Sequence, residues 1–322
     1  MRAALLKQLG RPPVVANIPI PTPKPGQALV RVTAAPLNPL DLLIASGHFY
    51  AGPPAIPYVP GAEGVGYVVQ ATSLTTGTRV RFETHAGYSG TGSLAEYVGV
   101  EESATLPIEE DLPDADAAAL GVSALAGWVS LQWRAQLMPG ERVLVLGATG
   151  AVGQIAIQAA RLLGAGHVVA AARPGETLEA LKDLGADAIV PLDSQDPVFL
   201  EAAFREAAGG PVDVTIDPLW GPPALAAIRA TATMGRVVNL GQSAASEVPV
   251  SSAAVRGRMV AVLGYSNLVA PAHVLAAAYK KIIHHARRGD LRMHLSTFTL
   301  GDVAEAWVEQ KASPHRKLVV VL

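Results

Sequence analysis

The sequence predicts an α/β protein in which a doubly wound parallel sheet is joined to a second, β-rich domain. At 322 residues the chain is longer than a typical single domain, so two domains are expected. Up to about residue 120, short β-like runs alternate with Pro- and Gly-rich turns, the pattern of an all-β barrel or sandwich. Beyond it, apolar strands alternate with helices, which is typical of a parallel sheet covered by helices.

The first region is predicted to contain several short strands and one helix. The strands span residues 28–32, 66–70, 78–82 and 94–100, and the helix spans residues 39–46. The end of the chain has a helical pattern at 271–288, an extended run at 292–300, a short helix at 302–309 and a strand at 318–322. Because these strands have no partners nearby in sequence, we expect residues 270–322 to complete a first domain made of residues 1–120. Residues 121–269 then form the second domain.

The second region is predicted to be a series of βα units. After an alanine-rich helical segment at 117–131, strands are expected at 143–146, 168–172, 188–190, 212–216, 236–240 and 259–263, with helices at 154–163, 177–184 and 196–208. Asp196 and Pro197 supply an N-cap and a first-turn proline for the last of these helices. Repeated units of this kind predict a parallel sheet wound on both faces.

The most informative stretch is the glycine turn after the first of these strands. Gly147, Gly150 and Gly153 stand at three-residue spacing directly after the apolar run Val143–Leu146, and a helical pattern begins at once. Such a turn needs glycine where a Cβ would clash and where the backbone approaches a pyrophosphate, and the helix N-terminus supplies unpaired N–H groups. The predicted dinucleotide contacts are Gly147, Ala148, Thr149, Gly150, Ala151, Val152 and Gly153. A tight turn without a nucleotide is the alternative.

The helix after this turn is apolar apart from Gln154, Gln158 and Arg161, at positions i, i+4 and i+7. This spacing predicts a single polar stripe on an otherwise buried helix. Gly164 ends the helix and a second strand follows. Strand, turn, helix and strand therefore fit within about 30 residues, as in a βαβ unit.

Composition excludes several classes of protein. Half of the residues are hydrophobic, yet no uninterrupted run approaches the ~20 apolar residues that a membrane span needs. The N-terminus lacks a long apolar core and a cleavage signal. There is no cysteine for disulfides or thiolate ligands, and the net charge of −2 disfavours nucleic acid as a partner. We expect a cytoplasmic protein with no membrane or nucleic-acid partner.

An ordered series of motifs covers essentially the whole chain. They are Asn38-Pro-Leu-Asp41, Gly61-Ala-Glu-Gly-Val-Gly66, Gly92-Ser-Leu-Ala-Glu-Tyr97, Pro139-Gly-Glu-Arg-Val143, Leu184-Gly-Ala-Asp187, Val212-Asp-Val-Thr-Ile-Asp217 and Gly235-Arg-Val-Val-Asn-Leu-Gly241. Together with the glycine turn, this series resembles the zinc-independent quinone oxidoreductase branch of the medium-chain dehydrogenase/reductase superfamily. The resemblance implies a GroES-like β-barrel catalytic domain, a Rossmann domain, and hydride transfer from a nicotinamide cofactor in the cleft between them.

This chain differs from other members of that superfamily at the positions of the metal ligands. The zinc alcohol dehydrogenases place a histidine ligand where this chain has Ala62, and they use cysteine ligands that this chain lacks. None of the eight histidines is arranged like a metal site. We expect no metal. Without such a Lewis acid, the favoured substrates carry their own electron sink, as quinones and α,β-unsaturated carbonyl compounds do.

The residue after the second strand of the βαβ unit indicates which nicotinamide cofactor is bound. NAD-specific folds usually carry an acidic residue about 20 residues beyond the glycine turn, where it binds the ribose 2′-hydroxyl. This chain has Arg173 there and no acid, and a guanidinium can pair with a 2′-phosphate. We therefore expect NADPH. A solvated arginine at a strand end is the alternative.

The nicotinamide end of the cofactor is expected where two later strands finish, because ligands of such sheets bind outside the carboxyl ends of the strands. The predicted contacts there are Leu240, Gly241, Gly264 and Tyr265. Lys317 resembles a family lysine close to the cofactor. Its alternative interpretation is a solvated lysine before an edge strand.

The candidates for catalytic contact with the substrate are Asn38, Tyr50 and Tyr58. Asn38 precedes a helix and its amide can donate to a ribose or substrate oxygen, although a plain helix cap would look the same. The two tyrosines lie in the loop after that helix, close to where the family's substrate pocket opens. Asp41 is expected to support the first turn of the helix, and Glu63 to be a buried structural carboxylate.

The resemblance therefore implies an NADPH-dependent reductase of a quinone or an α,β-unsaturated carbonyl compound, assembled as a homodimer. An enoyl-thioester reductase of a polyketide-type pathway is one alternative. A non-catalytic NADPH-binding protein of the same fold is another, and a zinc alcohol dehydrogenase is a more distant one.

Overall fold

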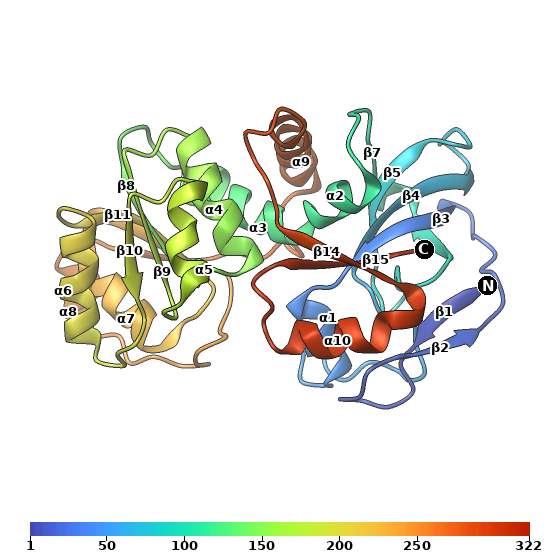
Figure 1. The fold of residues 1–322 in the computed structure, drawn as a ribbon, viewed down its shortest axis with the longest axis horizontal. Helices are drawn as coiled ribbons and strands as arrows, with labels where there is room; N and C mark the ends of the chain where they lie inside the picture. The colour runs from blue at the N-terminus through green and yellow to red at the C-terminus, as the bar shows by residue number, and fades with distance from the viewer. The chain divides into compact units, whose positions relative to one another are not determined.

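The computed structural model describes all 322 residues, and the chain divides into two compact units (Figure 1). The first unit consists of Met1–Val122 and Met293–Leu322, and the second consists of Ser123–Arg292. The chain's last residues therefore return to the first unit, as the unpartnered strands predict. The division differs from the expected one in the tail, because helix α9 (Ala272–Arg287) belongs to the second unit. Its buried face includes Tyr279 and Ile282, and His285 lies 5.5 Å from the Trp128 ring of the same unit.

The second unit contains a six-stranded parallel sheet. Its strands are β8 (Arg142–Leu146), β9 (His167–Ala172), β10 (Ala188–Pro191), β11 (Val212–Asp217), β12 (Thr231–Asn239) and β13 (Ala261–Gly264). The spatial order is β10-β9-β8-β11-β12-β13, so the order reverses between β8 and β11. The predicted doubly wound sheet is confirmed. Ligands of such sheets bind at the point of reversal, outside the carboxyl ends of the strands.

Helices cover both faces of this sheet (Figure 1). Helices α6 (Pro197–Ala207) and α7 (Gly221–Ala230) share one face, where Leu144 and Leu146 of β8 pack against Leu200 and Phe204. Helix α4 (Ala151–Leu162) packs against β8 and β9 on the other face. Asp196 caps α6 as predicted, since its carboxylate accepts the Val198 N–H at 2.9 Å.

The remaining helices of the second unit are shorter, apart from α9. They are α3 (Val122–Val129), a π-helical turn (Ser130–Arg134), α5 (Glu176–Glu179) with a 3₁₀ turn (Ala180–Leu184), and α8 (Ser252–Arg256). The helix predicted at 117–131 is thus interrupted. It is divided into α2 (Asp114–Ala119) and α3 at Gly121. A Cβ at Gly121 would lie 1.8 Å from the Glu63 carboxylate, so only glycine lets the chain pass there.

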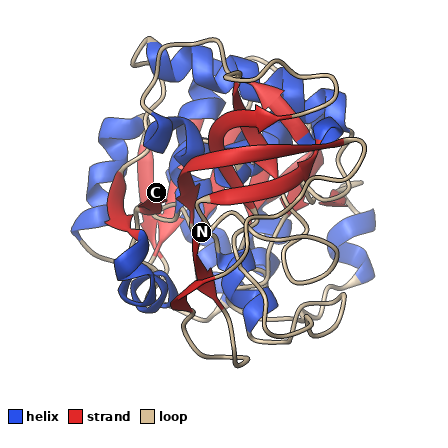
Figure 2. Ribbon diagram, turned by 90° about the vertical axis from the view of Figure 1, so that its right-hand side faces the viewer, coloured by secondary structure: helices blue, strands red, loops and turns tan.

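The first unit is built on a seven-stranded sheet, whose curved strands are drawn in red in Figure 2. Its strands are β3 (Gln27–Pro36), β4 (Glu63–Gln70), β5 (Arg79–Glu83), β6 (Tyr97–Glu101), β7 (Thr105–Pro107), β14 (Leu295–Thr299) and β15 (Lys317–Val321). A separate hairpin joins β1 (Arg2–Leu5) to β2 (Val14–Asn17). Strand β3 pairs with β4, and also with β6 along its first half and β15 along its end.

Three α-helices, two 3₁₀ turns (Glu102–Ala104 and Leu300–Asp302) and one apolar core complete the first unit. The helices are α1 (Pro39–Ala45), α2 and α10 (Val303–Lys311). The core includes Leu6, Phe82, Leu94 and Leu318, all fully buried. Because β15 lies antiparallel to β3, it places Lys317, its first residue, near the start of α1. This pairing brings together residues 279 positions apart in sequence.

Candidate functional site

The glycine turn, residues 147–153, joins β8 to α4 next to the reversal in strand order. Gly147 has φ +58°, a conformation that other residues rarely adopt. A Cβ at Gly153 would lie 2.5 Å from the Cα of Ala148 and 2.7 Å from two carbonyl oxygens, so the turn closes against the helix only with glycine there. A Cβ at Gly150 would meet only the Gly147 oxygen, at 3.4 Å. The backbone at Gly150 is therefore open to a ligand.

The residues present fit the phosphate groups of a dinucleotide. Gly150 is the N-cap of α4, so the N–H groups of Ala151, Val152 and Gly153 belong to the first turn of the helix, where no intrahelical partner exists. The side chain of Gln154 donates to the Thr149 carbonyl at 2.7 Å and holds the turn in shape. The helix dipole adds partial positive charge at the same point.

The two glutamines in the polar stripe of α4 are buried, whereas a polar stripe on a buried helix is expected to face solvent. Gln154 and Gln158 are only 3% and 6% exposed. The Gln158 amide donates to the Arg292 carbonyl and accepts the Arg292 N–H, both at 2.9 Å. Arg161 donates to the Gly185 carbonyl and pairs with Asp187. The stripe therefore fastens α4 to two other segments, a function that helical spacing alone does not reveal.

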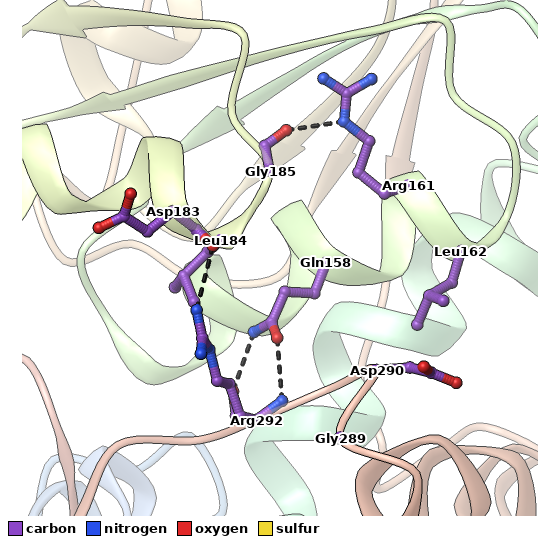
Figure 3. A pocket seen from close by; sticks show the side chains of 9 residues that line it. All are labelled: Gln158, Arg161, Leu162, Asp183, Leu184, Gly185, Gly289, Asp290 and Arg292. Carbon is purple, nitrogen blue, oxygen red and sulfur yellow. Dashed lines mark hydrogen bonds between the residues drawn. The ribbon is translucent and has the colours of Figure 1, made fainter.

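A pocket of about 370 Å³ lies at the end of α4 away from the glycine turn (Figure 3). Gln158, Arg161 and Leu162 line it together with residues 183–185, 289, 290 and 292. Figure 3 shows Gln158 directed at the backbone of Arg292, and the Arg292 guanidinium donates to the Asp183 carbonyl at 3.1 Å. The side chains of Gln158, Arg161, Asp290 and Arg292 are thus engaged within the protein, and the pocket lies away from the glycine turn.

Arg173 directly follows the last residue of β9, on the β9 side of the reversal in strand order. Its side chain is exposed, and its guanidinium has no hydrogen-bond or ion-pair partner. It is therefore available to an anion at the carboxyl end of the sheet. Its assignment to the 2′-phosphate remains a prediction.

The four residues predicted at the nicotinamide end lie where β12 and β13 finish. The Leu240 N–H donates to the Asp217 carbonyl at 2.9 Å, and the Tyr265 N–H donates to the Asn239 carbonyl at the same distance. Gly241 has no space for a Cβ, which would lie 2.6 Å from the Pro218 oxygen. Gly264 ends β13 with open space beside it. Their contact with a cofactor remains a prediction.

Asp217 is a residue of this region to which sequence reasoning assigned no role. It ends β11, is fully buried, and accepts hydrogen bonds from the Leu219 and Trp220 N–H groups and from the Asn239 side chain. Burial raises the pKa of its carboxyl, and these three donors act in the opposite direction. The signal in the sequence is an acidic residue that closes an apolar strand.

In the first unit, five buried side chains form a polar cluster: Asn38, Asp41, Glu63, Arg81 and Lys317. The Lys317 ammonium donates to the Asn38 Oδ1 at 2.5 Å, and the Asn38 Nδ2 donates to Glu63 at 3.1 Å. Arg81 pairs with Glu63 at 3.2 Å. Asp41 accepts the N–H groups of Asn38 and Ala62, both at 2.8 Å. Asp41 thus supports the start of α1 as expected, whereas the Asn38 amide is turned toward Lys317 and Glu63.

Burial dominates the ionisation of this cluster. It raises the pKa of Asp41 from 3.8 to about 6, against the lowering effect of the Asn38 N–H and the Lys317 charge. It lowers the pKa of Lys317, against the charges of Glu63 and Asp41. Lys317 is 2% exposed, so it is not the solvated lysine of the alternative interpretation. Its contact with a cofactor remains a prediction.

The two predicted tyrosines have different environments. Tyr58 is 8% exposed, and its hydroxyl is covered and has no hydrogen-bond partner. Burial, followed by the nearby Asp41 charge, raises the pKa of Tyr58, so the phenol stays neutral. Tyr50 is 78% exposed, and its ring centroid lies 4.1 Å from that of Phe49, with the two rings tilted by 43°. Their contact with the substrate remains a prediction.

Tyr88 joins the same aromatic group from a different loop. Its ring lies 6.1 Å from that of Phe49, and its hydroxyl donates to the Gly52 carbonyl at 2.9 Å. Sequence reasoning missed Tyr88, because only the fold brings residue 88 to the loop that follows α1.

Two further features bear on the class of protein. No group of three or more His, Cys, Asp or Glu side chains is arranged to hold a metal ion. None of the helices combines the length and the apolar character that crossing a membrane requires.

Two families of known domains match the two regions of the chain. Residues 24–110 match the alcohol dehydrogenase GroES-like domain, and residues 151–278 match the family described as zinc-binding dehydrogenase. The first match confirms the predicted GroES-like domain. The second covers most of the parallel sheet and begins within the glycine turn.

Three known proteins illustrate what the chain is similar to. The quinone oxidoreductase of Thermus thermophilus, also solved in complex with NADPH, is 30% identical with a TM-score of 0.82, over all of both chains. A phenolphthiocerol/phthiocerol polyketide synthase of Mycobacterium tuberculosis is 30% identical over 303 residues, 93% of this chain and 14% of that protein. The 2-methylene-furan-3-one reductase of Solanum lycopersicum is 38% identical over 181 residues, 53% of this chain. The chain spans 46% of that reductase.

Proposed function

Because the chain belongs to the medium-chain dehydrogenase/reductase superfamily, in its quinone oxidoreductase branch, we propose that it is an NADPH-dependent, zinc-independent reductase of quinones or α,β-unsaturated carbonyl compounds. The observation that carries this proposal is a pairing of two features. The chain has the whole glycine turn of a dinucleotide site, yet Ala62 and the absence of cysteine leave it without the ligands of a catalytic zinc.

The cofactor would be held by the second unit. The first-turn N–H groups of α4 would bind the pyrophosphate, with Gly150 giving it room to approach. Arg173 would pair with the 2′-phosphate, because its guanidinium is exposed and has no partner in the protein. The NADPH complex of the Thermus thermophilus protein supports this choice. When bound, the dihydronicotinamide supplies a hydride.

The substrate class follows from what the protein's own groups offer. Without a metal to polarise a carbonyl, the negative charge that develops on the substrate oxygen must be spread by conjugation and met by hydrogen-bond donors. Tyr58 would be such a donor, since its phenol is neutral and its hydroxyl has no partner. Movement of the loop around residues 50–58 is needed to uncover it. The aromatic side chains of Phe49, Tyr50 and Tyr88 would pack against a flat, conjugated substrate.

The test is the oxidation of NADPH and of NADH, followed at 340 nm against quinones, enones and enoyl thioesters. We expect turnover with NADPH and with quinones or enones.

The variant Arg173→Ala should weaken NADPH binding by about 10- to 100-fold, which corresponds to the loss of a charge-assisted pair, and should leave NADH binding unchanged. Lys182→Ala, which removes an exposed cation on the next helical segment, is the matched control. Activity with NADH alone contradicts the role of Arg173. If the protein binds NADPH but reduces no acceptor, the result supports the alternative of a non-catalytic NADPH-binding protein.

An enoyl-thioester reductase is the second candidate. It is favoured by the match to the polyketide synthase, which extends over 93% of this chain. Helix α9 contains no acidic residue and exposes Lys280, Lys281 and Arg287, a basic surface that suits an acidic carrier protein. Faster turnover of carrier-bound enoyl thioesters than of quinones, slowed by Lys280→Glu with Lys281→Glu, would establish this candidate in place of the first.

We also propose a homodimer that forms through β13. This strand is the edge of the parallel sheet and pairs on one side only, with β12. Met234, Met259 and Val262, which lie at or beside this edge, are 63%, 62% and 40% exposed. Light scattering coupled to size exclusion should give twice the mass of one chain, and Val262→Asp should halve it.

A further inference from the structure

Asp217 holds together the chain segments that follow β11 and β12. Its Oδ1 accepts the N–H groups of Leu219 and Trp220, both at 2.9 Å, and its Oδ2 accepts the side-chain amide of Asn239 at 3.0 Å. The carboxylate is fully buried at the carboxyl end of the sheet. Three donors on two oxygens are more than a simple turn requires.

The segment after β11 has a strained backbone. Trp220 has φ +60° and ψ −163°, a combination that non-glycine residues rarely adopt, and Gly221 follows with φ +69°. Such a conformation persists only where neighbouring contacts hold it. The Asp217 Oδ1 provides two of these contacts, at the N–H groups of Leu219 and Trp220.

The segment after β12 is held in place by contacts with Asp217 and with the segment after β11. The Asn239 side chain, held by Asp217, also donates to the Gly241 carbonyl at 2.7 Å. The Ala244 N–H donates to the Leu219 carbonyl at 2.8 Å, and Gly241 packs so closely on Pro218 that a Cβ would lie 2.6 Å from its oxygen. Residues 218–221 and 239–244 therefore form one unit centred on Asp217.

This unit lies directly beside the glycine turn. A Cβ at Gly147 would lie 3.0 Å from the Pro218 Cγ and 3.1 Å from the Leu219 Cδ2. It is on the β11 side of the reversal in strand order, whereas Arg173 is on the β9 side. A dinucleotide that crosses the reversal places one nucleotide on each side. With the 2′-phosphate near Arg173, the nicotinamide nucleotide faces the segments that Asp217 holds.

We propose that Asp217 is a positioning residue that shapes residues 218–221 and 239–244 for the nicotinamide half of the dinucleotide. It acts through Trp220 and Asn239 rather than by touching the ligand. The inference rests on the NADPH site proposed above. It assigns to Asp217 an effect on one half of the cofactor only.

The test is Asp217→Asn, which keeps the shape of the side chain. Asparagine has one oxygen in place of two, so its NH₂ group must face either the Asn239 amide or the Leu219 and Trp220 N–H groups. Asp213→Asn is the matched control, because Asp213 lies at the other end of β11 and its side chain accepts only the Arg142 N–H, at 2.8 Å. Calorimetry measures the binding of NADPH and of adenosine 2′,5′-bisphosphate, which represents the adenine half alone.

We expect Asp217→Asn to weaken NADPH binding by about 10-fold or more and to change bisphosphate binding by less than about 2-fold. In the ligand-free protein, hydrogen exchange at the amides of Leu219, Trp220 and Ala244 should be roughly 10-fold faster, with β8 unchanged. Asp213→Asn should leave both ligands unaffected. If Asp217→Asn does not fold, Asn239→Ala decides the question, since it should produce the same difference between the two ligands.

Two outcomes overturn the inference. One is unchanged NADPH binding by a folded Asp217→Asn variant, whether or not its hydrogen exchange is faster. The other is an equal loss for both ligands, which indicates a general structural role. Failure of the NADPH proposal itself is distinguishable, because the unmodified protein would then bind neither NADPH nor the bisphosphate.

Discussion

The glycine turn of the second unit and the polar cluster of the first unit are built from different groups. In the turn, backbone N–H groups form the site, and glycines leave room for the ligand. At Gly153 the structure has no space for a side chain. In the cluster, charged side chains create the environment, and Glu63, Arg81 and Lys317 are all nearly fully buried. The turn is local in sequence, whereas the cluster joins residues from four separate segments.

The difference shows how each region should respond to change. A site made of backbone depends on shape and is insensitive to pH, because amide groups do not titrate in the accessible range. The stability of a cluster of buried charges depends on the pairing of each charge, because a buried charge without a partner strongly destabilises the folded state. Substitutions that change volume and substitutions that change charge should therefore act differently on the two regions.

The largest effect on stability is expected for Glu63→Gln. Its carboxylate pairs with Arg81, lies near the charge of Lys317 and accepts the Val122 N–H at 2.7 Å. The variant removes the buried negative charge that faces both cations and leaves Arg81 with the partly exposed Glu83 alone, at 2.8 Å. We expect the free energy of unfolding to fall by about 3–5 kcal/mol in urea denaturation. Glu179→Gln, which breaks the exposed pair with Lys182, is the control and should cost less than about 0.5 kcal/mol. Equal effects of the two variants would contradict the importance of burial.

The next largest effect is expected for Gly153→Ala in the glycine turn. The new Cβ must displace the backbone of residues 147 and 148, so NADPH binding should weaken by about 100-fold, or about 3 kcal/mol. Gly99→Ala is the matched control, because a Cβ there would meet no atom nearer than 3.9 Å. Titration of the cofactor fluorescence measures both variants. The steric account fails if Gly153→Ala binds as the unmodified protein does.

A smaller, pH-dependent effect is expected for Asp41→Asn in the polar cluster. Burial raises the pKa of Asp41 to about 6, so the folded state binds its proton more tightly than the unfolded chain does. The stabilising contribution is therefore fully present below the unfolded value of 3.8 and is lost as the pH rises through about 6.

Between pH 4 and pH 7, the unfolding free energy of the unmodified protein should fall relative to that of Asp41→Asn, by on the order of 2 kcal/mol. Urea denaturation at several pH values measures the difference. Lys317 and Glu63, the neighbouring charged groups, are the same in both proteins. A difference that stays constant or rises with pH would contradict the raised pKa.

The smallest effect is expected for Tyr58→Phe. Removing a covered hydroxyl without a partner should raise the free energy of unfolding by about 1 kcal/mol, while kcat/KM for the substrate falls by about 10-fold. NADPH affinity should stay the same. The Tyr88 hydroxyl donates a hydrogen bond to the Gly52 carbonyl, so Tyr88→Phe should destabilise the protein instead. A stabilised Tyr58→Phe variant with full activity would show that this hydroxyl has no part in the reaction.

The contrast between the two regions also explains which parts of the site could be predicted. Gly147, Gly150 and Gly153 are recognisable because their function depends on backbone conformation and on neighbours within a few residues. The same holds for the Asp196 cap of α6 and for the alternation of strands and helices. The buried role of Gln158 was not predictable, since its partner Arg292 is more than 130 residues away.

The sequence by itself determined the doubly wound sheet, the glycine turn, a β-rich first domain and the absence of cysteine ligands. These depend on periodicity, on local backbone geometry and on composition, whereas the GroES-like domain was implied by the resemblance to a known family. Only the tertiary structure decided that Asn38 turns its amide to Lys317, that α9 belongs to the second unit, and that Asp217 binds two segments together. Each of these depends on which elements pack together. The pairing of β15 with β3 and of β11 with β12, for example, sets distances that no local pattern contains.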